Sequence, residues 1–213
     1  MKKLLILLFL FVPLLESMEN VGNELLASAK IVALSTGAAT LYGIANAELS
    51  AYLCPEFFSQ GGMLQMQNRL PRNNILKWML VSTDSPALKA AIWAPITSWW
   101  VGAAAGVPLA ILARLGTQMP QLSAGDLIKP LAIAMVATAT VSASFGAFAA
   151  YKARNPEYLA SFKINNINLM NGIPEKSELG YVAAACNTAA GYRLAVLAKL
   201  GLCGFVITKR LYS

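Results

Sequence analysis

The chain has 213 residues, of which 57% are hydrophobic and 13% are charged, and its mean hydropathy is +0.55. A soluble domain is typically about 25% charged, with polar residues along the exposed face of every helix. Here the charges form short clusters between apolar windows of about 20 residues, which indicates an all-α integral membrane protein and argues against a soluble one.

The net charge of +7 is typical of membrane proteins, which place Lys and Arg at helix ends where they contact the lipid bilayer. Because no dense basic run with interleaved aromatic residues occurs, nucleic acid binding is not expected. The chain has no histidine and three scattered cysteines, so it lacks the commonest general base and a thiolate metal site. We therefore expect no metal and no cofactor.

Residues 1–17 form a signal-like leader or anchor. Lys2 and Lys3 precede an apolar stretch from Leu4 to Leu15, which is the length of a signal peptide core rather than of a membrane span. The expected cleavage site is poor, because large residues stand where small ones are needed. An uncleaved anchor and a true start at Met18 are the alternatives, and residues 18–213 are expected to form a single membrane domain.

Four membrane spans are predicted in the rest of the chain, at about residues 31–53, 90–112, 130–151 and 180–207. At about 1.5 Å per residue, each can cross a hydrocarbon core of about 30 Å. Pro55 stops the first span, because proline cannot continue a helix. Pro95 and Pro108 predict kinks or local unwinding in the second.

Local signals mark where the helices begin. The sequence Thr83-Asp84-Ser85-Pro86 predicts a helix start, with Asp84 or Ser85 as the cap and proline at the first helical position. Ser123-x-x-Asp126 predicts a capping box before the third span. Pro174 is expected to open the last helix, and the apolar segment 75–81 is expected to lie along the membrane interface.

Small residues at Gly102 and Gly106 lie four apart in the second span. Because they share one helix face, they allow another backbone to approach closely. Helix packing within the monomer is the first interpretation. A homo-oligomer interface is the alternative.

Ionisable residues inside the spans are costly unless they are paired or solvated. Glu48 lies near the end of the first span, and Arg193 and Lys199 lie in the last. If these two spans run antiparallel, Glu48 and Arg193 come to a similar depth, which predicts an intramembrane charge pair. The alternative is that both side chains extend separately to the interface.

The carboxylates Glu48, Glu56 and Asp84 fall on one membrane side, but Asp84 is better explained as a cap and Pro55 separates the other two. Catalysis is therefore not expected, and the chain is not predicted to be an enzyme. Cys54 and Cys186 also lie at one side, where an oxidising compartment would permit a disulfide.

The membrane orientation has two solutions. The connections 54–89 and 152–179 carry eight Lys or Arg residues, against five on the opposite side, so the positive-inside rule places these two connections in the cytoplasm. A chain that starts at Met18 with its N-terminus inside gives the opposite orientation, which the disulfide would require.

The run ATLYGIANAELSAYLCPEFF (39–58) and the blocks TDSP, TSWWVGAAAGVPLAILARLG and LSAGDLIKPL resemble a family of uncharacterised bacterial four-span integral membrane proteins. The resemblance covers about half of the chain and is loose in the last span. It implies four spans in the bacterial inner membrane and no particular activity. Where these relatives tend to carry His and Asp, this chain has Asn46 and Ala47, so a His–Asp pair cannot act here.

The sequence thus favours a non-enzymatic structural or accessory membrane component. The alternative is a small transporter or channel, in which Glu48, Arg193 and Lys199 line a polar path through the membrane.

Overall fold

A computed structural model describes residues 23–59, 75–114, 119–170 and 172–212, and the leader expected at residues 1–17 lies outside them. Every regular element in these residues is helical. The four longest helices are α2 (Asn23–Leu53), α5 (Pro86–Arg114), α6 (Ala124–Lys152) and α9 (Glu178–Tyr212). All four are long and apolar enough to cross a membrane, so the prediction of an all-α bundle of four spans is confirmed.

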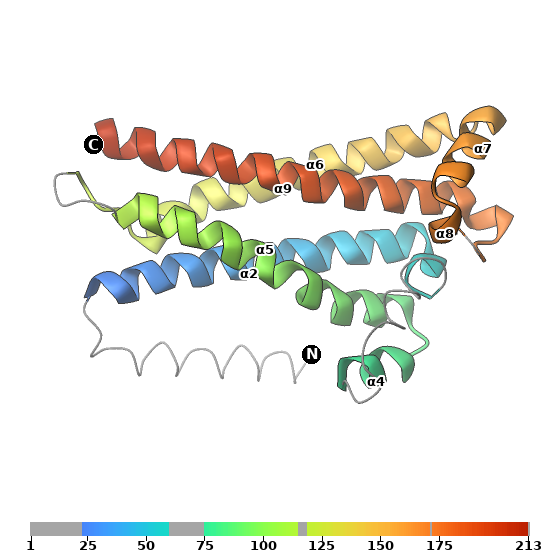
Figure 1. Ribbon diagram of the computed structural model, residues 1–213, viewed down its shortest axis with the longest axis horizontal. Helices are drawn as coiled ribbons and strands as arrows, with labels where there is room; N and C mark the ends of the chain where they lie inside the picture. The colour runs from blue at the N-terminus through green and yellow to red at the C-terminus, as the bar shows by residue number, and fades with distance from the viewer. Residues whose placement is uncertain (1–22, 60–74, 115–118, 171, 213) are drawn as a thin grey trace.

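The four long helices run in alternating directions along the long axis of the molecule (Figure 1). Five short elements lie between them: η1 (Pro55–Phe58), α4 (Ile75–Val81), α7 (Pro156–Asn165), α8 (Ile167–Met170) and η2 (Glu175–Ser177). In Figure 1, α4, α7 and α8 lie at the end of the bundle where α2 finishes and α9 begins. In α4, Ile75, Trp78 and Val81 are exposed, as a segment at the membrane interface requires.

Capping residues set the helix boundaries more than hydrophobicity does. Ser85 Oγ accepts the Leu88 N–H at 3.3 Å, so α5 begins at Pro86. Ser123 and Asp126 form the predicted capping box, and α6 begins at Ala124. Because these caps precede the apolar windows, both helices start several residues before the predicted spans.

Both prolines of α5, Pro95 and Pro108, lie inside an unbroken helix. The expected local unwinding therefore does not occur. Flanking turns keep their backbone hydrogen bonds, which allows a membrane helix to continue through a proline.

The bundle is built from two helix pairs, since α2 packs most extensively on α5, and α6 packs most extensively on α9. Glycines permit both contacts. A Cβ added at Gly102 would lie 2.6 Å from Ser35 O in α2, and one added at Gly146 of α6 would lie 2.7 Å from Ala183 O in α9. These contacts are too close for any side chain, so the two backbones of each pair approach directly.

Two separate clusters of buried apolar side chains lie at opposite ends of the bundle. The first surrounds η1 and includes Phe57, Phe58, Trp93 and Tyr181. The second lies where α5 ends and α6 begins, and it includes Ile31, Leu109, Leu127 and Val206. The middle of the bundle, between these clusters, is less completely filled.

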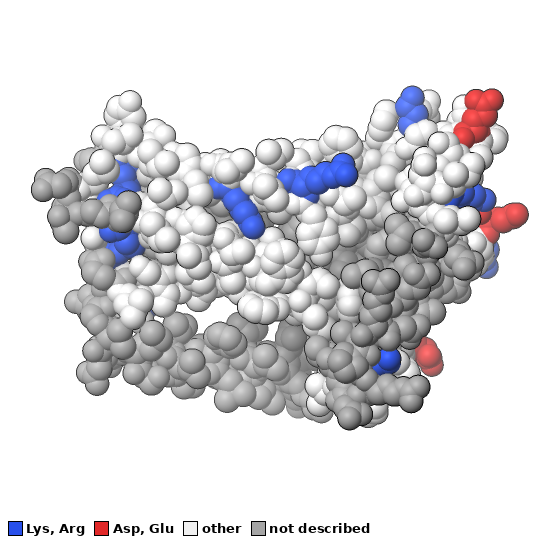
Figure 2. Space-filling model, in the orientation of Figure 1, with Lys and Arg blue, Asp and Glu red and all other residues white. Residues whose placement is uncertain are grey.

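Charged side chains concentrate at the ends of the molecule (Figure 2). On the face shown, Asp and Glu side chains lie only toward the end that carries α7. The middle of this face is uncharged except for Lys and Arg side chains over α9. A central band with few charges, and charges at both ends, is the surface expected of a membrane-spanning bundle.

Candidate functional site

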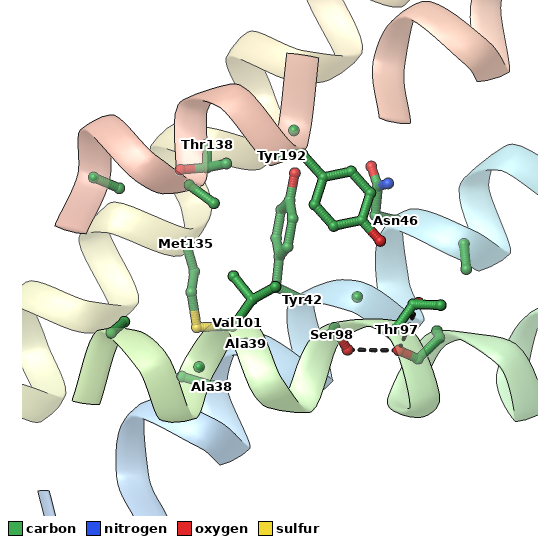
Figure 3. A pocket seen from close by; sticks show the side chains of 18 of the residues that line it. Ala38, Ala39, Tyr42, Asn46, Thr97, Ser98, Val101, Met135, Thr138 and Tyr192 are labelled. Carbon is green, nitrogen blue, oxygen red and sulfur yellow. Dashed lines mark hydrogen bonds between the residues drawn. The ribbon is translucent and has the colours of Figure 1, made fainter. Parts of the chain in front are cut away.

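A cavity of about 300 Å³ lies between the two helix pairs and is lined by residues of all four long helices. Most of the lining consists of small or apolar side chains, among them Ala39, Gly43, Val101, Ala134, Met135 and Ala195. Tyr42 from α2 and Tyr192 from α9 point into this space (Figure 3). The cavity is thus mainly apolar, with a few polar groups at fixed positions.

The space exists because the helices turn small residues inward and large residues outward. On α5, Trp99 and Trp100 are 53% and 55% exposed on the outer surface of the bundle, whereas Ser98 and Gly102 line the cavity. Trp93 is the exception on this helix, since it lines the cavity and is only 8% exposed.

One face of α9 carries the polar groups that remain available in the cavity. Thr188, Tyr192, Ala195, Lys199 and Leu202 line the cavity at spacings of three and four residues, which places them along one helix face. Among the residues that the structure describes, neither the Tyr192 hydroxyl nor the Lys199 ammonium group has a hydrogen-bond or ion-pair partner. Lys199 is the one cation of this lining.

Side-chain hydrogen bonds join α2 to the other helix pair beside the cavity. Asn187 Nδ2 donates to Asn46 Oδ1 at 2.9 Å, and the hydroxyls of Ser50 and Thr188 lie 3.3 Å apart. The Tyr42 hydroxyl lies 3.3 Å from Ser142 Oγ in α6. The buried Asn187 Oδ1 has no hydrogen-bond partner within the described part of the chain. These bonds fix how α2 faces the second pair.

The turn after α2 closes one end of the cavity. Phe57 and Phe58 line it, their rings pack edge to face at 5.2 Å, and Phe57 lies 5.3 Å from the Tyr181 ring. Pro55 starts this turn, and Gly180 of α9 lies so close to Leu53 O that a Cβ there would lie 2.2 Å from it. The end of α2 is thereby held against the start of α9.

Glu56 ties the same turn to the segment before α9. Its carboxylate accepts the Ser177 hydroxyl at 2.9 Å and the Cys54 thiol at 3.5 Å. The pKa of Glu56 is lowered, first by its own backbone N–H and then by Ser177 and Cys54. The pKa of Cys54 is raised to about 11, mainly by burial and then by the hydrogen bond and the negative charge of Glu56.

The charge pair expected between Glu48 and Arg193 is not formed. Within the described residues neither side chain has a hydrogen bond or an ion pair, and Arg193 is exposed. The reason is helix register. Tyr42 lies over Gly191, and Asn46 bonds Asn187, so Glu48 is about two turns from the level of Arg193.

The other predicted site residues have structural surroundings. Gly102 and Gly106 both face α2 within the monomer, since a Cβ at Gly106 would lie 2.8 Å from Val32 Cα. Cys54 and Cys186 are free thiols, and the Cys54 thiol donates a hydrogen bond to the Glu56 carboxylate. Of the three ionisable residues expected to line a polar path, Lys199 lines the cavity, while Glu48 and Arg193 do not.

The basic end of the chain has a structural role that the sequence did not reveal. Arg210 is 6% exposed, and its guanidinium donates to Leu112 O at 2.5 Å and to Pro120 O at 2.9 Å. Lys209 pairs with Asp126 at 2.9 Å. The end of α9 therefore holds the connection between α5 and α6.

No group of three or more Cys, Asp or Glu side chains that could hold a metal ion comes together in the described residues. No family model, curated protein or solved structure matches this chain. The cavity is accordingly interpreted from its own chemistry. Sequence reasoning missed it, although the high content of Ala, Gly and Ser on the facing helix surfaces was a usable signal.

Proposed function

We propose that this protein is a non-enzymatic accessory component of a membrane that holds a small hydrophobic molecule from the bilayer between its helix pairs. The observation that carries the proposal is the cavity of about 300 Å³ lined by all four long helices. Its volume lies at the lower end of the range of small-molecule sites, and its apolar lining with few polar groups is typical of them.

Closure of the cavity along the bundle axis favours binding over conduction. Phe57 and Phe58 fill the end near η1, and Leu131 and Leu202 border the opposite end. A molecule that enters sideways from the bilayer meets small side chains, whereas an ion crossing the bundle meets two apolar clusters. Transfer of an ion through such clusters is strongly unfavourable.

Trp93 offers a direct test, because it lines the cavity while Trp99 and Trp100 face the membrane. The test uses a variant that keeps Trp93 as its single tryptophan and is purified in non-ionic detergent. This variant is titrated with a brominated fatty alcohol, because bromine quenches indole fluorescence on contact. We expect saturable quenching of Trp93. The matched protein that keeps only Trp100 should show weak quenching that rises linearly with the probe in the micelle.

A filled cavity supplies the control. Ala195→Phe places a ring in the cavity from α9, and Val196→Phe places the same ring on the neighbouring position, which is 54% exposed. Saturable quenching should be lost in the first variant and kept in the second. Equal, linear quenching in both variants would show that the cavity holds nothing.

Transport is the second candidate, favoured by the position of Lys199 on the cavity wall. Solute or ion flux into liposomes that is lost in Lys199→Met and kept in Glu48→Gln would support it, because only Lys199 lines the cavity. Flux unchanged in both variants, or no flux at all, would favour the binding role.

We also propose that the chain belongs to the bacterial four-span family that its motifs resemble, and that it resides in the inner membrane. The proposal rests on the resemblance of the run 39–58 to that family and on the four helices that are long and apolar enough to cross a membrane. Reporter fusions at the C-terminus, with membrane fractionation, test the location and the orientation together.

A further inference from the structure

We infer that the molecule held in the cavity is an organic anion, with one carboxylate or phosphate group beside Lys199 and an apolar chain that extends toward Phe57 and Phe58. This inference rests on the proposed binding function and specifies its ligand. It follows from the unpaired cation on the cavity wall, the shape of the cavity and the placement of the acidic residues.

Lys199 lies far inside α9, near the middle of a helix of 35 residues. A lysine at such a depth is costly unless an anion or water compensates its charge. Among the described residues no acidic group approaches it: Asp126 pairs with Lys209, and Glu178 pairs with Lys163 at the other end of the bundle. In the proposed complex, the occupant of the cavity supplies the compensating charge.

Arg193 is a second cation of α9, but it lies on a different face of the helix from Lys199. It lies six residues before Lys199, so it points about 120° away around the helix axis, and it is exposed rather than lining the cavity. Only Lys199 can contact a molecule in the cavity, which makes Arg193 a matched control.

The cavity extends along the helices. On α2 its lining runs from Ser35 to Ala47, which corresponds to about 18 Å of helix. Lys199 lies toward the end bordered by Leu131 and Leu202, and Trp93 lies with Phe57 at the other end. An extended acyl chain with its acidic group at Lys199 would place its methyl end near Trp93.

The test compares a dibromo fatty acid with the corresponding dibromo fatty alcohol at a pH of about 8, where a carboxylic acid is ionised and a lysine is charged, again by quenching of Trp93. We expect the acid to bind about tenfold more tightly than the alcohol, which is about 1.4 kcal/mol. Lys199→Met should remove this preference without removing binding of the alcohol. Lys199→Arg and Arg193→Met should retain it, and retention of the folded state is checked by circular dichroism.

Each outcome has one meaning. Equal affinities for acid and alcohol in the native chain would overturn the anion inference while leaving the proposed binding function intact. Absence of saturable quenching by either probe would overturn both. Loss of the preference in Arg193→Met as well as Lys199→Met would assign the effect to overall charge and would also overturn the inference.

Two further probes identify the source and the direction of the anion. If a brominated phosphatidate quenches Trp93 as strongly as the fatty acid does, the anion is assigned to a lipid headgroup. If only the fatty acid quenches Trp93, the anion is assigned to a free carboxylate. Bromines near the methyl end should quench Trp93 more strongly than bromines near the carboxylate. The reverse order would overturn the assignment of the acidic group to Lys199.

Discussion

Helix α2 presents two different surfaces to its neighbours. Toward α5 it meets Gly102 and Gly106, where the two backbones approach closely and the Ser35 hydroxyl donates to Gly102 O at 2.9 Å. Toward α6 and α9 it meets side chains, through the bonds of Asn46, Ser50 and Tyr42, and it leaves the cavity between them.

The comparison shows how a membrane bundle can be rigid and hollow at once. In a bilayer the lipid is as apolar as the helices, so close backbone contact and interhelical hydrogen bonds replace the hydrophobic effect as the sources of association. The surface toward α5, called here the glycine surface, relies mainly on close backbone contact, with one added hydrogen bond from Ser35 to Gly102 O. The surface toward α6 and α9, called here the polar surface, relies on the hydrogen bonds of Asn46, Ser50 and Tyr42. These side chains keep the helices farther apart, which leaves room for a ligand.

The largest effect is expected on the glycine surface. Gly102→Ala would place Cβ 2.6 Å from Ser35 O and from Thr36 Cα, so the two backbones must separate. We expect a loss of about 2 kcal/mol or more in stability, measured by thermal unfolding in detergent. Gly37→Ala, on α2 with no atom within 4 Å, should be neutral or stabilising by up to about 1 kcal/mol. Similar losses in the two variants would show that α2 and α5 do not pack through Gly102.

A smaller effect is expected on the polar surface. A double-mutant cycle of Asn46→Ala and Asn187→Ala should give a coupling energy of about 0.6 kcal/mol and at most about 1.7 kcal/mol, the range for such bonds in membranes. A control cycle of Asn187→Ala with Thr36→Ala should give none, because Thr36 bonds Val32 O within its own helix. Coupling of equal size in the control would assign the effect to general loosening.

The stability that Glu56 contributes, at the η1 end of this surface, should depend on pH. The pKa of Glu56 is lowered in the folded protein, so its contribution to stability is present above the ordinary carboxyl pKa and is lost as pH falls through the folded value. Ser177→Ala removes one accepted hydrogen bond and should cost at most about 1 kcal/mol at neutral pH. In acid, where the carboxyl group is protonated, the difference between this variant and the native chain should shrink. A constant difference would exclude the charged hydrogen bond as its source.

The last prediction concerns the reactivity of the Cys54 thiol and involves the smallest change in the fold. Because its pKa is about 11, the thiol should react with alkylating reagents very slowly at neutral pH and faster as pH rises toward that value. Glu56→Gln removes the negative charge beside the thiol but keeps an acceptor oxygen, so the pH dependence of the alkylation rate should move downward while burial keeps it above the ordinary value. Rapid alkylation of the native chain at neutral pH would contradict the buried, carboxylate-bonded position.

The sequence predicted the helix starts well, because they depend on local signals, but it predicted contacts between distant residues poorly. The caps at Ser85 and at Ser123 with Asp126 are confirmed because each depends on residues within one turn. The ion pair predicted between Glu48 and Arg193 is not among the ion pairs of the described residues, because it depended on the register of α2 against α9, which Asn46 and Asn187 set in space. The buried role of Arg210 was missed because its acceptors, Leu112 O and Pro120 O, lie about ninety residues away in the chain.

The sequence by itself determined that the chain forms four helices long and apolar enough to cross a bilayer, because hydropathy and caps report on solvent and on neighbours along the chain. Tertiary structure decided which face of each helix turns inward. Helices that are apolar on all sides carry little periodic signal for their rotation about the axis. The cavity and the inward position of Lys199 therefore follow only from how Gly102 fits α2 and how Asn46 meets Asn187.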